Sequence, residues 1–427
     1  MKVLELSDLQ IKKGYEIGDL KMAVRTMTGN YEEVVITPTS EAQERVPSVG
    51  KDAISKVTVE AIPSQYIDPS DTTATADTVT EGKTFYDASG QKVVGTRGAD
   101  MLQARVDAAK SGAYLFHYYE GDNLDFAKDL DISNVTDMSS AFSNCKNVKD
   151  FSVIENWDWR SVTKANSLFS NCRFTEAPDI DISNIEEFLS GFYNCYNMTS
   201  MPQYNLSKAK KLSNCFYGCY ALKEIPLIDT SGAEEMSQFF GSCTKLEVIP
   251  QLNTSKVKSF SNFAMYCYAL KIFPALDTKN ATSMGSMFSY CSALVTVELI
   301  DMRSLTNGGA NYMFSGCSKL TNLNLKNVTQ SLQIGSGTSW GHLLTLDSLI
   351  NTVQELWTDT ASRTLTMATA SKEKLASVYV KLVDITDEMR AQDEFIDKKL
   401  PFAVCESTDE GAMLITDYVK LKNWTIA

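Results

Sequence analysis

The spacing of the cysteines constrains the fold of this chain more than any other feature. Eight of the ten cysteines follow one another at intervals of 27, 23, 24, 24, 24, 24 and 26 residues: Cys145, Cys172, Cys195, Cys219, Cys243, Cys267, Cys291 and Cys317. A nearly fixed period of this size predicts repeated units that stack, because one such unit cannot bury its own apolar face. Cys215 and Cys405 fall outside the spacing.

Other residue types repeat in step with these cysteines. A phenylalanine lies three residues before each of them, except that Ala264 precedes Cys267, and apolar residues lie three and six residues after most of them. We expect a short strand at the L-x-x-I-P-x-L segment of each unit and a capping turn at the D-x-S that follows. Val257, Phe260 and Phe263 have helical spacing, which predicts an inward-facing helix in each unit.

The cysteines themselves predict a structural column. One cysteine per unit at a constant position is typical of a small, buried apolar residue. Disulfides would require paired side-chain directions at every step, and Cys215 and Cys219 have no histidine nearby with which to bind zinc.

The repeat resembles a known family. Residues 222–231 (L-K-E-I-P-L-I-D-T-S) and 284–291 (M-G-S-M-F-S-Y-C) look like the BspA-type leucine-rich repeat, in the variant found in surface lipoproteins and in many phage-encoded proteins. The resemblance covers about residues 130–325. It implies an α/β solenoid, a leucine-rich repeat array of about eight 24-residue units, with a small β-rich N-terminal anchor and an α/β C-terminal cap. The family mostly supplies binding surfaces.

A second resemblance lies upstream of the repeats. Residues 72–86 (T-T-A-T-A-D-T-V-T-E-G-K-T-F-Y) and 90–96 (G-Q-K-V-V-G-T) are similar to a short module common in tail and other virion proteins of phages that infect Gram-positive and gut bacteria. Thr78 and Val79 stand where that family has two aliphatic residues, and Phe85 replaces a small one. Residues 35–63 resemble the extended segment that often precedes the module. The module itself reads as a β-hairpin with its turn at residues 87–90.

The C-terminal part resembles the terminal cap that follows such repeats in phage proteins. That cap usually ends K-G-W-T, whereas this chain ends K-N-W-T-I-A with Asn423 in the glycine's place. We expect helices over residues 346–357, 371–395 and 411–421, and strands at 363–367 and at Trp424. Before the repeats we expect a helix over 101–109 and a strand over 114–119.

These segments divide the chain into four regions. Residues 1–98 are expected to dock on a virion or to oligomerise, and residues 99–129 to cap the solenoid. Residues 130–325 form the repeats, and residues 326–427 the C-terminal cap.

Charge and composition exclude several functions. The 53 acidic residues outnumber the 40 basic ones, for a net charge of −13, which argues against nucleic acid and against an anionic membrane surface as partners. With only His117 and His342 available, most hydrolase triads and zinc sites are disfavoured. No apolar run is long enough for a transmembrane helix, and the first residues lack the apolar region of a signal peptide.

The sequence predicts no catalytic site. It contains no nucleotide-binding glycine loop, nucleophile elbow or metalloprotease motif. The carboxylate pairs Asp129 with Asp131 and Asp179 with Asp181 would suit glycoside hydrolysis, but equivalents of Asp131 and Asp181 recur in most units, so we expect them to cap turns. His117 is expected to be a satisfied or half-exposed residue. We therefore expect no enzyme activity, no cofactor and no metal.

Tyrosines next to the core positions form the candidate binding site. Phe192 and Phe216 occupy the core positions, so their neighbours should point elsewhere, and stacking of the units would align the rings along one face. Phenol rings suit sugar faces and protein contacts, since they combine a large rigid area with a polar group. Filling between adjacent units is the alternative. The candidates are Tyr193, Tyr196, Tyr217, Tyr220, Tyr266, Tyr268 and Tyr290.

Together these features predict a bacteriophage virion structural protein, a tail or head fibre, assembled in the cytoplasm of the host bacterium. Its N-terminal region would contact other virion proteins and form a homo-oligomer, for which we expect a trimer. Its repeats would bind a bacterial surface protein or glycan. The alternative is a bacterial cell-surface leucine-rich repeat adhesin or an intracellular scaffold.

Overall fold

The chain divides into two compact units, Met1–Ala104 and Arg105–Ala427. The computed structural model describes six short strands between residues 20 and 94, the four residues Gln103, Val106, Asp107 and Ala109, and residues 110–427 except 337–339, 342 and 359–360. His342 and the expected turn at residues 87–90 lie outside the described residues.

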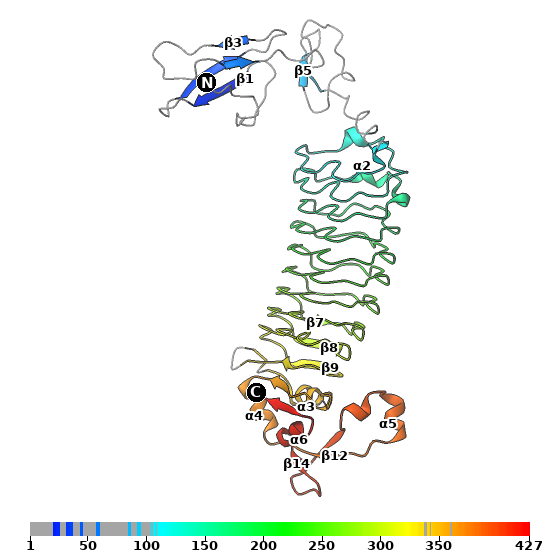
Figure 1. The fold of residues 1–427 in the computed structure, drawn as a ribbon, viewed down its shortest axis with the longest axis vertical. Coiled ribbons are helices and arrows are strands. Elements are labelled where there is room, and N and C mark those ends of the chain that lie inside the picture. Colours follow the sequence, from blue (N-terminus) through cyan, green and yellow to red (C-terminus); the bar gives the residue numbers. More distant parts are fainter. Residues whose placement is uncertain are drawn as a thin grey trace. The chain divides into compact units, whose positions relative to one another are not determined.

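The strands described in the first unit form three antiparallel pairs (Figure 1). They are β1 (Leu20–Arg25) with β2 (Tyr31–Ile36), β3 (Gln43–Arg45) with β4 (Val57–Val59), and β5 (Thr84–Tyr86) with β6 (Lys92–Val94). Thr84 lies opposite Val94, which confirms the hairpin predicted within the phage-like module.

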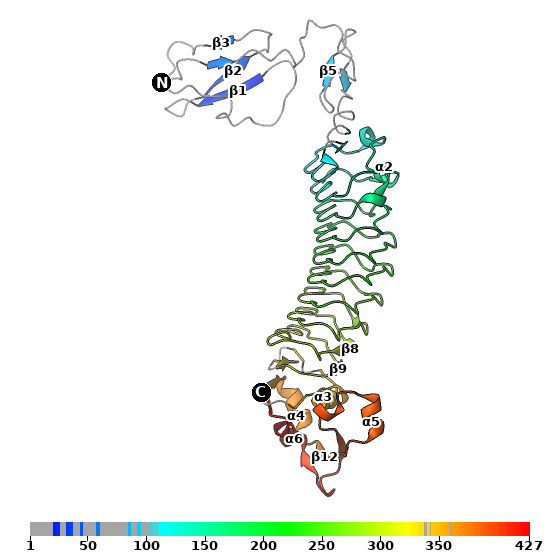
Figure 2. The same ribbon diagram turned by 45° about the vertical axis from the view of Figure 1, so that its right-hand side comes forward.

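In the second unit the backbone winds through successive coils that stack on one another (Figures 1 and 2). Isolated parallel bridges join each coil to the next, in the order Ser111, Asp137, Lys164, Glu187, Lys211, Glu235, Ser259 and Ser283. The last coils also pair through a parallel sheet of β7 (Ile272–Phe273), β8 (Thr296–Asp301) and β9 (Asn322–Lys326). Below, a position within a coil is counted from its cysteine, so that −3 is the phenylalanine.

The prediction of a helix in each unit was wrong. Between Lys211 and Cys219 the amides alternate: Phe216 N donates to Phe239 O in the next coil at 2.9 Å, while Cys219 N donates to Phe216 O in its own coil at 3.2 Å. Positions −5 and −1 are left-handed, as at Asn214 with φ 58° and Gly218 with φ 72°, which a right-handed helix cannot contain.

The spacing of apolar residues led to the wrong prediction because these coils bury residues at the same intervals as an amphipathic helix does. Positions −7, −4, −3 and 0 point inward, and their separations are those of i, i+3, i+4 and i+7. In one coil these residues are Leu212, Cys215, Phe216 and Cys219, all without solvent exposure. Cys215, which lies outside the cysteine spacing, is therefore a second core residue of its coil.

Short helices occur only in the first coils of the array, among the described residues before 328: η3 (Asp125–Ala127), α2 (Ser152–Glu155) and η4 (Trp159–Ser161). The strand predicted over residues 114–119 was also wrong. These residues form one more coil of turns, in which Phe116 stacks on Phe142 with 5.4 Å between ring centroids. The described residues of the helix predicted over 101–109 are helical.

Two columns of side chains run through the core. Rings at position −3 stack from coil to coil, as Phe192 does on Phe216 with centroids 5.5 Å apart and planes 6° apart. Where Ala264 interrupts the column, Phe263 packs edge-on against Phe240. The second column is the cysteines, all eight of which are fully buried, as predicted.

Each cysteine also has a polar contact that the spacing did not predict. Its thiol donates a hydrogen bond to the carbonyl oxygen at position −3 of the preceding coil, at 3.0–3.3 Å in all eight coils. Burial raises the pKa of Cys145, Cys243 and Cys317 to about 12, so these thiols stay protonated.

Rows of alternating charge cross the outside of the coils. At position −8 the residues are Asp137, Lys164, Glu187, Lys211 and Glu235, and at position −9 they include Glu186, Lys210, Glu234 and Lys258. Within these rows Lys211 lies 3.4 Å from Glu187, and Lys258 lies 3.1 Å from Glu234.

The C-terminal part, coloured orange to red in Figure 1, contains two small sheets. The parallel sheet comprises β10 (Leu332–Gln333), β11 (Arg363–Thr366) and β15 (Trp424–Ile426), and the antiparallel sheet comprises β13 (Phe402–Cys405), β12 (Tyr379–Leu382) and β14 (Met413–Leu414). The helices are α3 (Leu346–Gln354), α4 (Thr369–Leu375), α5 (Asp387–Gln392), η5 (Ile396–Lys398) and α6 (Ile415–Leu421).

The first and last helices predicted in this part, and both strands, are confirmed, but the single helix over 371–395 was wrong. Strand β12 interrupts it: Val378 and Val380 are buried two residues apart, as in a strand, and Tyr379–Leu382 pairs with β13.

The K-N-W segment at residues 422–424 connects the end of the chain to the region around the end of α3 through hydrogen bonds. The side-chain nitrogen of Lys422 is buried and donates to the carbonyl oxygens of Gln354, the last residue of α3, and Leu356, at 3.0 and 2.7 Å. Asn423 is left-handed with φ 61°, a conformation that glycine adopts without strain and that asparagine tolerates. Trp424 Nε1 donates to the carbonyl oxygen of Trp357 at 2.8 Å.

Candidate functional site

All seven candidate tyrosines lie at the turn around the cysteine of their coil, and they form two groups. The first group is Tyr193 and Tyr217 at position −2 with Tyr196 and Tyr220 at position +1. The rings of Tyr193 and Tyr217 stack with centroids 5.1 Å and planes 9° apart, and those of Tyr196 and Tyr220 stack at 5.6 Å and 10°. Partial burial, with the nearby phenols of Tyr217, Tyr196 and Tyr193, raises the pKa of Tyr220.

The second group is Tyr266 and Tyr290 at position −1 with Tyr268 at position +1. Tyr290 stacks on Tyr266 with centroids 5.2 Å apart, and Tyr268 lies 6.1 Å from Tyr266. Tyr220, Tyr268 and Tyr290 are 43%, 47% and 50% exposed, so about half of each ring surface is available to a ligand.

The rings do not form the continuous stripe that the sequence suggested, because the Cys243 coil separates the groups. That coil carries Gly241, Ser242 and Thr244 at positions −2, −1 and +1. A Cβ atom at Gly241 would lie 2.8 Å from Cδ2 of Tyr217, so the glycine makes room for the last ring of the first group. Gly316 does the same for Tyr290, at 3.0 Å from Cδ1.

The backbone of Tyr266 and Tyr290 is in a conformation that bulky residues rarely adopt. Their φ angles are 64° and 63°, in the left-handed region, where other coils have asparagine, serine or glycine at this position. A non-glycine residue in this region costs about 1–2 kcal/mol. Two stacked tyrosines therefore stand where the backbone conformation disfavours their residue type.

Three more tyrosines share this geometry and were missed by the sequence interpretation. Tyr114, Tyr118 and Tyr312 are left-handed and 58%, 62% and 64% exposed. The signal was present for Tyr312, which stands five residues before Cys317 as Asn214 and Asn262 stand before their cysteines.

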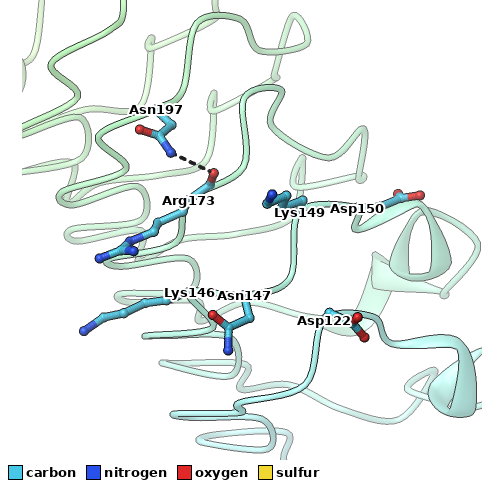
Figure 3. A pocket seen from close by; sticks show the side chains of 7 residues that line it. All are labelled: Asp122, Lys146, Asn147, Lys149, Asp150, Arg173 and Asn197. Atoms are coloured by element: carbon cyan, nitrogen blue, oxygen red, sulfur yellow. Dashed lines mark hydrogen bonds between the residues drawn. The ribbon is translucent and has the colours of Figure 1, made fainter.

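Basic residues next to the first group were missed as well. Lys146 and Arg173 occupy position +1 on the two coils that precede Tyr196 and Tyr220. They line a shallow groove together with Lys149, the amides Asn147 and Asn197, and the carboxylates Asp122 and Asp150 (Figure 3). Asn197 donates its amide hydrogen to the backbone oxygen of Arg173 at 3.3 Å.

One aspartate of each carboxylate pair caps a turn, as predicted. Asp131 Oδ1 accepts from Ser133 N at 2.8 Å and Asp181 Oδ1 from Ser183 N at 3.0 Å, and the same contact recurs at the equivalent residue of the other coils. The backbone hydrogen bond from Ser133 lowers the pKa of Asp131, which is the opposite of what a general acid needs.

His117 is half-buried between the rings of Tyr114 and Tyr118, and its Nδ1 atom is buried without a hydrogen-bond partner among the described residues. The described residues contain no group of three His, Cys, Asp or Glu side chains arranged to hold a metal ion. In the part of the chain that the structure describes, no helix is both long and apolar enough to cross a membrane.

One family model matches the chain, twice in succession. It is DUF285, described as a Mycoplasma protein of unknown function, and it matches residues 113–226 and 203–328, which together make just over half of the chain. Both matches fall on the stacked coils. No curated protein and no solved structure matches the chain significantly.

Proposed function

Because the chain belongs to the DUF285 family, whose BspA-like repeats occupy residues 113–328, we propose that it is a recognition protein without catalytic activity. Its coils hold the two tyrosine groups as a rigid surface that binds a bacterial surface protein or glycan. We also propose that the stacked coils are an α/β solenoid of the leucine-rich repeat class, since parallel bridges join equivalent residues of successive coils.

The observation that carries this proposal is the left-handed backbone of Tyr266 and Tyr290. A coil that served only stability would have asparagine or glycine at position −1, as the Cys195 and Cys219 coils do. Half-exposed stacked phenols at a cost in backbone energy are what a binding surface needs, because each ring offers a large rigid face and a hydroxyl group.

The particle that displays this surface is proposed to be a bacteriophage virion, with the protein as its tail or head fibre. The support is the similarity of residues 72–96 to the module of phage virion proteins, together with the pairing of β5 with β6 inside that segment. Residues 1–98 would then contact other virion proteins and form a homotrimer. Several copies on one particle would raise the avidity of individually weak contacts.

A bacterial cell-surface adhesin is the second candidate. The description of the family, which names Mycoplasma, favours it, since it places such repeats in a bacterium.

Immunogold electron microscopy separates the two candidates. An antibody against the full chain would be applied to phage particles and to cells from the source culture. We expect gold on the particles, and its place on head or tail identifies the fibre. Gold on cell envelopes alone would overturn the virion proposal and support the adhesin.

The binding surface has its own test. Fluorescently labelled full-length protein should adsorb to cells of the source culture, and Y266N/Y290N should adsorb less. Q238A/N262A is the control, because it changes two left-handed positions that carry no tyrosine. Equal adsorption of all three proteins would contradict the proposed surface.

A further inference from the structure

Position +1 of four successive coils carries Lys146, Arg173, Tyr196 and Tyr220, a set that we call the +1 row. The backbone turns in the same way along it: the amide at +1 donates to the carbonyl oxygen at −1 in the Lys146, Tyr196 and Tyr220 coils, at 2.8, 2.9 and 2.9 Å. The row spans three coil steps, which is about 14 Å at the usual spacing of paired strands.

The cations of the +1 row differ from three lysines that stand beside a carboxylate on these coils. Lys211, Lys258 and Lys271 each lie within 4 Å of a carboxylate on the preceding coil. In contrast, Lys146 and Arg173 are exposed, and in the described part of the chain neither forms an ion pair. In a chain of net charge −13, two adjacent unpaired cations form a locally positive site.

The carboxylates of the same groove keep their negative charge but form no ion pair with Lys146 or Arg173 among the described residues, and each has another partner. Asp150 Oδ1 accepts from Ser152 N at 2.8 Å, and Asp122 Oδ1 accepts from the side chain of Asn123 at 2.9 Å. Figure 3 shows Lys146 and Arg173 extending to one side of the groove, with Asp122 and Asp150 at the other side. The positive half of the groove therefore continues into Tyr196.

We infer that the +1 row binds an acidic polysaccharide. The stacked rings of Tyr196 and Tyr220 contact sugar rings through their exposed parts, and Lys146 with the planar guanidinium of Arg173 holds the carboxylate or phosphate groups of the same polysaccharide. This inference rests on the proposed function and names the chemistry of its ligand.

The experiment measures binding of the full chain to immobilised polymers by biolayer interferometry. Polygalacturonate supplies carboxylates on sugar rings, a phosphomannan supplies phosphates on sugar rings, and fully methyl-esterified polygalacturonate is the neutral counterpart of polygalacturonate. An oligothymidylate tests single-stranded nucleic acid, whose bases and phosphates would use the same side chains. We expect binding to one of the acidic polymers, weakened by salt, and none to the neutral one.

Two double variants locate the site. K146Q/R173Q should weaken binding by about tenfold, the effect expected of two surface ion pairs lost together. Y196S/Y220S should also weaken it, and should leave its salt dependence unchanged. K245Q/K319Q is the matched control, since both lysines are exposed at position +2 of other coils.

Three results would overturn the inference: no binding to either acidic polymer, equal loss in K146Q/R173Q and K245Q/K319Q, or tighter binding of the oligothymidylate. Adsorption to cells separates this failure from that of the proposed function. If K146Q/R173Q adsorbs to cells as the wild type does, the acidic ligand is wrong and the recognition role stands. If the wild type does not adsorb, the recognition role fails.

Discussion

The thiol of Cys243 donates a hydrogen bond to the carbonyl oxygen of Phe216, with 3.0 Å between Sγ and O. The same oxygen accepts the amide of Cys219 in its own coil at 3.2 Å. One carbonyl group thus closes the turn of one coil and fixes the position of the next. This arrangement gives the cysteine a role that alanine or valine could not fill.

We expect Cys243→Ala to lower the free energy of unfolding by about 1–2 kcal/mol, because it removes that hydrogen bond and leaves a small cavity. The midpoint of urea denaturation measures the change. Cys405→Ala, at a partly exposed position in β13, is the control and should cost less than about 0.5 kcal/mol. Equal effects of the two substitutions would show that the thiol contact contributes nothing.

The buried thiols also predict alkaline unfolding. The pKa of Cys145, Cys243 and Cys317 is about 12 in the folded chain, against 9.0 for a free thiol. Above pH 9 the unfolded chain loses these protons and the folded chain keeps them, so the stability is fully present below pH 9 and is lost as the pH rises towards 12.

Each such thiol contributes a loss of about 1.4 kcal/mol per pH unit in that range. Urea midpoints between pH 7 and pH 11 should therefore be level at first and then fall steeply above pH 9. A midpoint that is level throughout would contradict the burial of the thiols.

Tyr312→Asn should stabilise the protein. Tyr312 is 64% exposed and has φ 57°, and asparagine stands at the same position of the Cys219 and Cys267 coils. Asparagine tolerates the left-handed conformation, so we expect a gain of about 0.5–1 kcal/mol by urea denaturation. Asn262→Ala, which removes an asparagine from the same left-handed position of another coil, should lower the free energy of unfolding by a similar amount. A loss of stability in Tyr312→Asn would mean that the ring packs usefully where it is.

Lys211→Glu should destabilise the array through the charged row at position −8. It would place a third carboxylate between Glu187 and Glu235, at a cost of about 0.5–1 kcal/mol for such half-exposed groups. Urea denaturation at low salt measures the cost, and 1 M sodium chloride should remove most of it. Lys245→Glu, outside the row, is the comparison; if it costs as much, the row has no special effect.

The sequence allowed the buried positions of the coils to be predicted, but not the conformation of their backbone. Phe216 and Cys219 could be placed in the core from their spacing alone, because apolar residues that recur at the repeat period are buried at equivalent positions of each coil. The helix could not be excluded on that basis, since Leu212, Cys215, Phe216 and Cys219 have helical intervals. What distinguished the two was the residue type at positions −5 and −1, where Asn214 and Gly218 mark left-handed backbone.

The tyrosine groups could be predicted in part. All seven candidates are at least partly exposed, and each stacks on or lies beside another. Their division by Gly241 required the stacking of coils to be known. Lys146 and Arg173 were missed because their coils have no tyrosine at position +1, so only a comparison of that position across coils connects them with Tyr196.

The alternation of acidic and basic residues along the charged rows determines which coils can be lost without bringing like charges into contact. Loss of the coil that contains Lys211 would set Glu187 against Glu235 and Glu186 against Glu234. Loss of the Glu187 and Lys211 coils together would set Lys164 against Glu235 and keep opposite charges in contact. Loss or gain of coils in pairs, a length change of about 10 Å, would therefore keep the alternation at position −8, whereas loss of one coil would break it.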